Sequence, residues 1–164
     1  MRPKTQSQQA NNKISARSTF VSRDSEKTRI LIVCDDESIT ERLNLALRED
    51  GFQVKCASSM TAGCTSATSG RFQVIFTVPV LRDGSWRRLA DLARDNDQGF
   101  VVVLVASDFD FNQCAKALDD GAFDVLDPLR ELPKTTAAAR CALWAAYLKG
   151  AGPSPEVGSH PMAA

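Results

Sequence analysis

The chain of 164 residues predicts one α/β domain, with a parallel sheet covered by helices on both faces. Three observations carry this prediction. Short apolar runs alternate with segments of helical periodicity through the central region. Two of these runs, ILIV at 30–33 and FVVVLVA at 100–106, are apolar throughout, which is typical of strands buried on both faces. Polar segments with few large apolar residues flank the region at either end.

The first strand is predicted at Arg29 to Val33, where RILIV forms a continuous apolar run. The helix after it is predicted from Ile39, Leu43 and Leu47, which recur every four residues and therefore share one face. Ser38 is a suitable N-cap for this helix, because its hydroxyl can accept a bond from a backbone N–H. The second unit follows as a strand over 52–57 and a small-residue helix over 61–69.

The remaining three units are predicted in the same way. They comprise strands over 72–78, 100–106 and 123–127, and helices over 85–96, 110–120 and 133–149. The run FVVVLVA at 100–106 is the most apolar strand and is expected to be central in the sheet. Trp86 and Leu89 are spaced for packing in the third helix. Pro133 suits the first turn of the last helix, where its missing N–H is not needed.

Five strand–helix units predict a doubly wound, flavodoxin-like (βα)5 fold, a three-layer sandwich with a parallel sheet of order 2-1-3-4-5. In such a sheet, ligands bind beyond the carboxyl ends of the strands, beside the point where the strand order reverses. The loops in which to seek a site are therefore 34–37, 77–84, 106–108 and 127–129.

The two ends of the chain differ in composition from its middle. Residues 1–27 are predicted to be a disordered basic arm, residues 28–149 the domain, and residues 150–164 a flexible tail. The first 29 residues hold seven Lys or Arg and two Asp or Glu, a net charge of +5, and the remainder carries −5. The arm is either a solvated leader or a contact for nucleic acid or an acidic partner, and its dispersed charges favour the leader.

The composition of the chain also indicates where in the cell the protein is located. No apolar run reaches the roughly 20 residues that span a bilayer, and the first residues lack the apolar core of a signal peptide. We therefore expect a cytoplasmic protein with no membrane contact. The cysteines are odd in number and lack C-x-x-C spacing, which favours reduced thiols over a disulfide framework or a zinc site. They are Cys34, Cys56, Cys64, Cys114 and Cys141.

Three segments carry a resemblance to the receiver domains of bacterial response regulators, the proteins of two-component signalling. ILIVCDDESI at 30–39 resembles the end of the first receiver strand, where acids follow. VLRDGSW at 80–86 resembles the turn after the third strand. ALDDGAFDVL at 117–126 is similar to the approach to the fifth strand and is the most specific of the three. The resemblance spans residues 29–129.

The resemblance implies a phosphorylation site at the carboxyl edge of the sheet, which we call the rim. An aspartate there accepts the phosphoryl group, acids hold Mg²⁺, and a lysine pairs with the phosphate. A Ser or Thr is coupled to an aromatic side chain on the fifth strand that moves inward on phosphorylation, the switch aromatic. The sequence departs from most of these parts. Val78 stands at the phosphoacceptor position, Ala106 at the Ser/Thr position, Pro128 at the lysine position and Val125 at the switch aromatic. Ser107 would replace Ala106 if the register shifted by one residue.

A chain without the carboxylate nucleophile cannot form an acyl phosphate. No carboxylate occurs between Phe72 and Arg82, so this conclusion survives a small shift of register. We therefore expect a degenerate pseudo-receiver with no catalytic residues, which is not an enzyme. The motif Asp83-Gly84 is predicted to be a plain turn.

The acids after the first strand admit two interpretations. The first acid of the receiver pattern aligns with Cys34, which leaves Asp35 and, one place further out, Asp36 as candidate metal ligands. They are either helix caps and solvated acids, which is the favoured interpretation, or a residual low-affinity Mg²⁺ site. No cofactor is required. Cys34 is expected to be an inert thiol, because its neighbours in sequence are acids.

The predicted function is a stand-alone receiver-like module of a two-component or phosphorelay system, acting by phosphorylation-independent protein–protein interaction. The expected partner is a signalling protein or a second copy, bound through the fourth helix, fifth strand and fifth helix. The last helix supports this face because it is apolar over more than one stripe. The candidate contact residues are Val125, Trp144, Tyr147 and Leu148.

Two functions of other classes remain as alternatives. A small flavodoxin-like enzyme or nucleotide binder is disfavoured because the chain has no glycine-rich phosphate loop. A nucleic-acid-associated regulator would use the basic N-terminal arm, and this contact is also less favoured.

Overall fold

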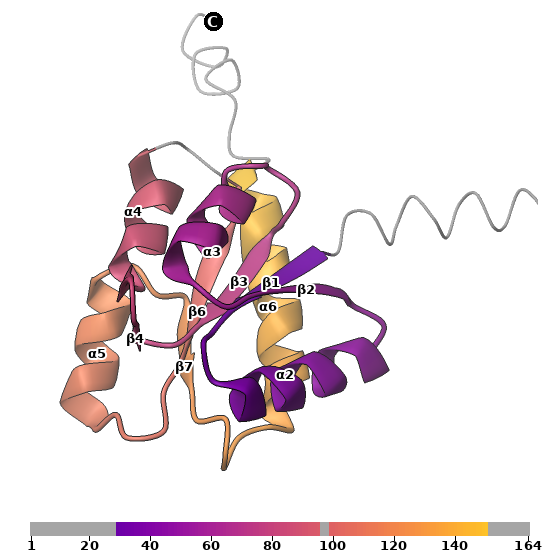
Figure 1. Cartoon of the computed structure of the whole chain (residues 1–164), viewed down its shortest axis with the longest axis vertical. Helices are drawn as coiled ribbons and strands as arrows, with labels where there is room; N and C mark the ends of the chain where they lie inside the picture. The colour runs from indigo at the N-terminus through magenta and orange to yellow at the C-terminus, as the bar shows by residue number, and fades with distance from the viewer. Residues whose placement is uncertain (1–28, 96–98, 151–164) are drawn as a thin grey trace, which may run out of the picture.

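The computed structural model of the chain describes residues 29–95 and 99–150, which form a sheet with helices on both faces (Figure 1). The predicted arm over 1–27 and nearly all of the predicted tail over 150–164 lie outside the described residues. In the described part of the chain, no helix is long and apolar enough to cross a membrane.

The main sheet is parallel and confirms the predicted topology. Its order is β2-β1-β3-β6-β7, which is the order 2-1-3-4-5 when only these strands are counted. The most apolar strand, β6, lies between β3 and β7 in the interior of the sheet, as its composition predicts. The strands are β1 (Arg29–Val33), β2 (Gln53–Ala57), β3 (Val74–Thr77), β6 (Val101–Val105) and β7 (Asp124–Leu126).

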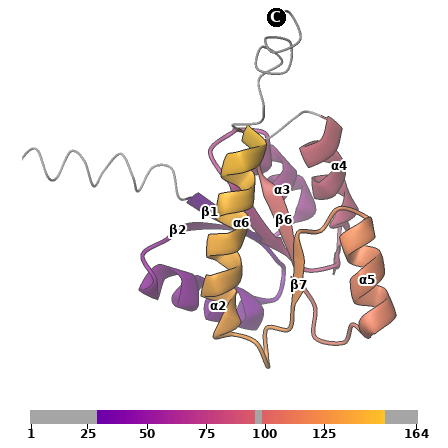
Figure 2. The same cartoon turned by 180° about the vertical axis from the view of Figure 1, so that it is seen from behind.

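The helices divide between the two faces of the sheet. α2 and α6 cover one face, and α3, α4 and α5 cover the other (Figures 1 and 2). Every predicted helix is present, with ends that differ by one or two residues where they are described. The helices are α2 (Glu37–Glu49), α3 (Met60–Ala67), α4 (Arg87–Asp95), α5 (Phe111–Asp119) and α6 (Lys134–Gly150).

Two separate cores follow from the alternation of side chains along each strand. In β1, Ile30 and Ile32 point into the core below α2 and α6, whereas Leu31 and Val33 point into the core below α3, α4 and α5. All four side chains are fully buried. The apolar strand therefore supplies both layers, which is why its sequence shows no alternation.

Aspartate side chains cap two of the helices, and Asp36 is one of the acids whose favoured interpretation was a helix cap. The N-cap of α2 is Asp36, whose Oδ1 accepts from the N–H groups of Ser38 (2.9 Å) and Ile39 (3.2 Å), so the predicted cap at Ser38 is wrong. Asp110 caps α5 and exchanges bonds with Gln113 in a capping box. Both caps satisfy N–H groups that a helix start leaves unpaired.

A short antiparallel hairpin, absent from the sequence prediction, follows β3. It consists of β4 (Val80–Leu81) and β5 (Gly84–Ser85). Asp83 at its tip is more than the plain turn residue that was predicted. Its carboxylate accepts from the Met60 N–H (2.7 Å), the Thr61 N–H (2.9 Å) and the Thr61 hydroxyl (2.8 Å) at the start of α3.

Candidate functional site

The positions singled out in the sequence meet at the carboxyl edge of the sheet. The register pairs Val33 with Thr77, Thr77 with Leu104, and Val105 with Leu126, so the strands end side by side. The loops that follow them carry the predicted site residues. These are Asp35 and Asp36 after β1, Val78 after β3, Ala106 after β6 and Pro128 after β7.

Val78 stands directly after the last residue of β3. It is half-buried and packs against both cores, so it joins the two layers at the rim. The Thr77 hydroxyl before it donates to the Val78 carbonyl at 3.2 Å. The side chain at this place is therefore an apolar packing group that offers no nucleophile.

Asp35 points toward the hairpin after β3. Its Oδ2 accepts from the Arg82 N–H at 3.3 Å, which links the β1–α2 loop to the hairpin. Two carboxylates therefore fix the turn of the hairpin. Asp35 binds the backbone of Arg82 in the turn, and Asp83, in the turn itself, binds the start of α3. Sequence reasoning missed the role of Asp83, because its partner helix lies more than 20 residues earlier in the chain.

The donor set for a metal ion is sparse. Asp36 is already the α2 cap, and among residues 29–95 and 99–150 no group of three or more His, Cys, Asp or Glu is arranged to hold a metal. Mg²⁺ prefers a nearly octahedral set of oxygens and usually takes one or two carboxylates plus phosphate oxygens. Asp35 and Asp36 alone are a poor match, and a weak Mg²⁺ site there stays a prediction.

The loops after β6 and β7 close the other end of the rim. The Ala106 N–H donates to the Leu126 carbonyl at 2.8 Å and extends the pairing of the two strands. Pro128 is buried. Beside it, Glu131 accepts from the Asp127 N–H (3.1 Å) and from Lys134 (3.0 Å). These bonds, the first above all, lower the pKa of Glu131 below its usual value.

A hollow of about 240 Å³ lies between these two loops. We call it the Val125 pocket. Apolar atoms of Phe109, Cys114 and Val125 line one part of it, and charged groups stand at another. The complete lining is Ala106, Ser107, Phe109, Cys114, Val125, Asp127, Arg130 and Glu131.

A second hollow, of about 290 Å³, lies beside the β1–α2 loop at the opposite end of the rim. Its walls include the thiols of Cys34 and Cys56 together with carboxylates from α2. Burial raises the pKa of both thiols above the ordinary value, so they are mainly protonated at neutral pH. This agrees with the expectation that Cys34 is inert.

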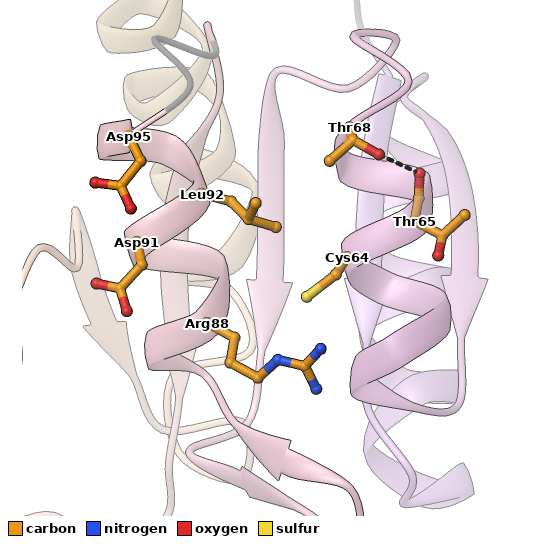
Figure 3. Close-up of a pocket in the computed structure, with 7 residues that line it drawn as sticks. All are labelled: Cys64, Thr65, Thr68, Arg88, Asp91, Leu92 and Asp95. Carbon is orange, nitrogen blue, oxygen red and sulfur yellow. Dashed lines mark hydrogen bonds between the residues drawn. The ribbon is translucent and has the colours of Figure 1, made fainter.

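A third hollow, of about 370 Å³, lies between α3 and α4, on the face of the domain (Figure 3). Arg88 reaches from α4 toward α3, where the Cys64 sulfur faces the gap. Burial again raises the pKa of the Cys64 thiol, although the Arg88 charge opposes the shift. The lining is Cys64, Thr65, Thr68, Arg88, Asp91, Leu92 and Asp95.

The predicted contact residues do not form one patch. Trp144 and Tyr147 are 64% and 63% exposed and stack with ring centroids 5.7 Å apart. Tyr147 lies two turns after Arg140, which binds Asp50 at the end of α2, so Tyr147 is on the α2 side of α6. Val125 belongs to the opposite layer, where it is half-buried.

Leu148 completes the predicted set and is 54% exposed. It lies one turn after Trp144, so it shares the exposed surface of α6 with the aromatic pair. Three of the four predicted contact residues therefore lie together on α6, and Val125 lies apart from them in the other layer of the domain.

Comparison with known proteins identifies the class of fold. No family model matches the chain. The receiver domain of a response regulator from Clostridium thermocellum superposes with a TM-score of 0.66 at 22% identity, over 74% of this chain and 98% of that one. The beryllofluoride-activated NtrC4 receiver domain dimer gives 0.66 at 24% identity, over 73% and 98%. These likenesses show that the chain has the receiver fold.

One curated relative is similar in sequence. It is the "Uncharacterized transcriptional regulatory protein YkoG" of Bacillus subtilis (strain 168), 29% identical over 118 residues. The match covers 72% of this chain and 52% of the relative. The chain thus spans about half the length of the curated relative that it matches.

Proposed function

We propose that this chain is a receiver-like module of a two-component or phosphorelay system that acts by protein–protein contact without being phosphorylated. It is, on this proposal, a non-enzymatic module of the bacterial cytoplasm. The cytoplasm is favoured because its five cysteines are all unpaired thiols.

The observation that carries the proposal is Val78 at the end of β3. Phosphoryl transfer to a receiver needs a carboxylate at that place, and Val78 is an apolar residue packed into both cores. Two carboxylates of the adjoining loops already have partners. Asp35 accepts from the Arg82 N–H, and Asp83 accepts from N–H groups at the start of α3. Pro128 adds no positive charge that would neutralise a phosphate.

A covalent test follows from this observation. The full chain is incubated with Mg²⁺ and acetyl phosphate at neutral pH, and its intact mass is measured beside that of an ordinary receiver treated in the same way. The expected spectrum shows no phosphate adduct on this chain and a clear one on the other. A single adduct on this chain that depends on Mg²⁺ would defeat the proposal.

The partner surface proposed here is the outer face of α6. Large exposed aromatic side chains are enriched where proteins bind one another. Trp144 and Tyr147 fit this description, because they are stacked on each other and more than half exposed. The partner of this face is a protein of the same signalling system.

A second candidate function comes from the name of the curated relative, which describes a transcriptional regulatory protein. On this alternative the basic residues of the arm over 1–27 contact DNA. The expected sign would be DNA binding that weakens steeply with salt and disappears when residues 1–27 are deleted. Binding with a flat salt dependence, or binding that survives the deletion, would remove this candidate.

A further inference from the structure

We propose that residues 17–21 of this chain dock as an added antiparallel strand on the outer edge of β2. These residues, which we call the arm strand, have the sequence RSTFV and belong to the basic arm outside the described residues. The docked sheet has six strands, with Arg17 at the rim. The inference goes beyond the proposed function, because it concerns a contact within one chain.

The edge of the sheet at β2 offers backbone groups for such a strand. β2 is the first strand of the sheet and has β1 on one side only. The Cys34 N–H donates to the Ala57 carbonyl, so the alternate residues Val54 and Cys56 direct their backbone groups outward. In the part of the chain that the structure describes, the hydrogen bond to these outward groups is one from Arg48 to the Val54 carbonyl, at 3.3 Å. Such an edge is a template for another strand.

The chain enters the sheet at the start of this edge. Arg29, the first residue of β1, pairs with Gln53, the first residue of β2, and their side chains share a hydrogen bond of 3.3 Å. The outer side of β2 is two strand spacings from β1, about 10 Å. Residues 22–28 can span roughly 20 Å, which is enough for this crossing. A strand that precedes the crossing runs antiparallel to β2, because β1 and β2 both lead away from this end.

The composition of the arm favours this division into strand and crossing. Thr19, Phe20 and Val21 are β-branched or aromatic, which are the residue types enriched in strands. The residues after them, SRDSEKT at 22–28, are polar and include Asp24, which suits a turn. The arm strand is therefore the part of the arm best suited to pair with β2.

The other end of the β2 edge carries negative charge. The hollow of about 290 Å³ beside the β1–α2 loop is lined by Ser58, just after β2, and by the carboxylates of Asp35, Glu37 and Glu41. All three acids are exposed. Glu37 and Glu41 make no ion pair with another residue of the described ranges. A cation brought to this end of β2 therefore finds carboxylates that have no cationic partner of their own.

These charges select the register of the pairing. With Val21 opposite Val54, antiparallel pairing places Arg17 opposite Ser58, beside the carboxylates of the hollow. Val21 then extends the layer below α2, against which Val54 packs. A shift by one residue would place Arg17 opposite Ala57, whose side chain belongs to the other layer.

Docking replaces one existing hydrogen bond. Arg48 must release the Val54 carbonyl, which then accepts from the Val21 N–H. The Arg48 side chain keeps a partner, because its Nε also donates to the Asn44 side chain at 2.8 Å. A long bond to an exposed side chain is thus exchanged for a backbone bond of the sheet.

A docked arm changes two surfaces at once. It brings the Arg17 charge to the β1–α2 end of the rim, and it occupies basic residues that would otherwise be open to nucleic acid. The arm is then available to DNA only in the undocked state, which makes docking on β2 and DNA contact mutually exclusive.

The test is amide hydrogen exchange of the full chain, followed residue by residue by NMR. With the arm strand docked, the N–H groups of Val54 and Cys56 donate to its carbonyl groups and exchange slowly. Thr19→Pro removes the N–H that faces the Cys56 carbonyl and breaks the arm strand. In this variant the two N–H groups are expected to exchange about 10-fold faster, or more, than in the wild type.

Two controls accompany this variant. Thr5→Pro makes the same substitution elsewhere in the arm and is expected to leave both exchange rates unchanged. The Lys55 N–H points toward β1, so it should exchange slowly in every variant, which shows that the sheet is intact.

A charge swap tests the register. Arg17→Glu adds a carboxylate beside those of the hollow and should raise the exchange rates of Val54 and Cys56 by about 3-fold. Adding Glu41→Arg to this variant restores an opposite charge and should return both rates toward the wild-type values. A swap that restores nothing would overturn the placement of Arg17.

Three further results would overturn the docked strand. The first is equal exchange of the Val54 and Cys56 N–H groups in the wild type and Thr19→Pro, and the second is an equal effect of Thr5→Pro. The third is protection that grows with protein concentration, because the arm would then pair with β2 of a second copy. Failure of the proposed function would appear separately, as a phosphate adduct in the mass spectrum.

Discussion

Asp83 holds the hairpin to the start of α3, and the sequence did not reveal this role. Three hydrogen bonds, led by that from the Thr61 N–H, lower its pKa from 3.8 to about 2. A carboxylate whose pKa is lower in the folded state stabilises the fold above its unfolded pKa. This stabilisation is lost as the pH falls from about 4 through about 2.

The first prediction concerns the pH dependence of Asp83→Asn. The variant is expected to unfold at lower urea concentration than the wild type at pH 6, because the neutral amide cannot bind the α3 N–H groups as an anion does. The difference in the free energy of unfolding should shrink between pH 4 and pH 2. Urea melts followed by circular dichroism measure it.

Asp91→Asn is the control for this prediction, since Asp91 is exposed on α4 near the same face. It should lower the free energy of unfolding at pH 6 by less than Asp83→Asn does, because the bonds to the start of α3 come from Asp83. If Asp83→Asn and the wild type remain equally stable at pH 6, Asp83 does not hold the hairpin to α3 and the account of this residue fails.

Caps show what local sequence can and cannot predict at the residue scale. Asp36, Ser38 and Asp110 all have capping side chains, and the choice of Asp36 over Ser38 depends on where the β1 loop turns into α2. The sequence offered Asp35, Asp36 and Ser38 as possible caps of this helix and could not decide among them. Asp83 was not predictable at all, because its partners come from another element.

At the scale of elements, the contact between α3 and β1 depends on a glycine. A Cβ built on Gly63 would lie 2.7 Å from both methyl groups of Val33. Such a distance is shorter than carbon atoms allow, so the helix would have to move off the sheet. Gly63 therefore sets how closely α3 approaches β1.

The second prediction is that Gly63→Ala destabilises the domain by about 1–2 kcal/mol. Overpacking a tight core costs about 1–3 kcal/mol, and the higher helix propensity of alanine returns part of it. The free energy of unfolding from urea melts is the measurement. In the background of Val33→Ala, which removes the two methyl groups, the same substitution should cost less.

Ala62→Gly calibrates this experiment, because residue 62 is exposed on the same helix. It should cost about 1 kcal/mol from propensity alone. A stabilising Gly63→Ala, or one with the same effect in both Val33 backgrounds, would contradict the close approach of α3 to β1.

The buried strands were predictable from continuous apolar runs, and the helices from their periodicity. RILIV and FVVVLVA are buried on both faces, and the apolar positions of α2 recur on one side. The hairpin over 80–85 was not predictable, since two strands of two residues have no period. Its pairing comes from the path of the chain between β3 and α4.

At the scale of the whole molecule, alternation of strands and helices was enough to predict the sheet order, because right-handed crossovers leave few other arrangements. The position of the candidate site followed from the same topology. The structure does not place all of the predicted contact residues on one face. Val125 and Tyr147 share the last part of the sequence, but they lie on opposite sides of the sheet.

The division of that face has a physical cause. Helix α6 is apolar on several sides, so periodicity did not indicate which side packs on the sheet. The structure buries its small residues, Ala139, Ala142 and Ala146, and leaves Trp144 and Tyr147 outside. Small residues permit a close approach of the helix to the sheet, and the large aromatic rings then have no room beneath it.

The most direct test of the central claim, a rim without phosphoryl chemistry, uses Trp86. This side chain is buried, and its backbone N–H donates to the Pro79 carbonyl at 3.1 Å, next to Val78. With Trp144 replaced by Phe, its fluorescence is followed while Mg²⁺ and then Mg²⁺ with beryllofluoride, a phosphoryl mimic, are added. We predict no saturable change with the mimic. A saturable change would mean that a carboxylate binds the mimic at this rim, which contradicts the claim.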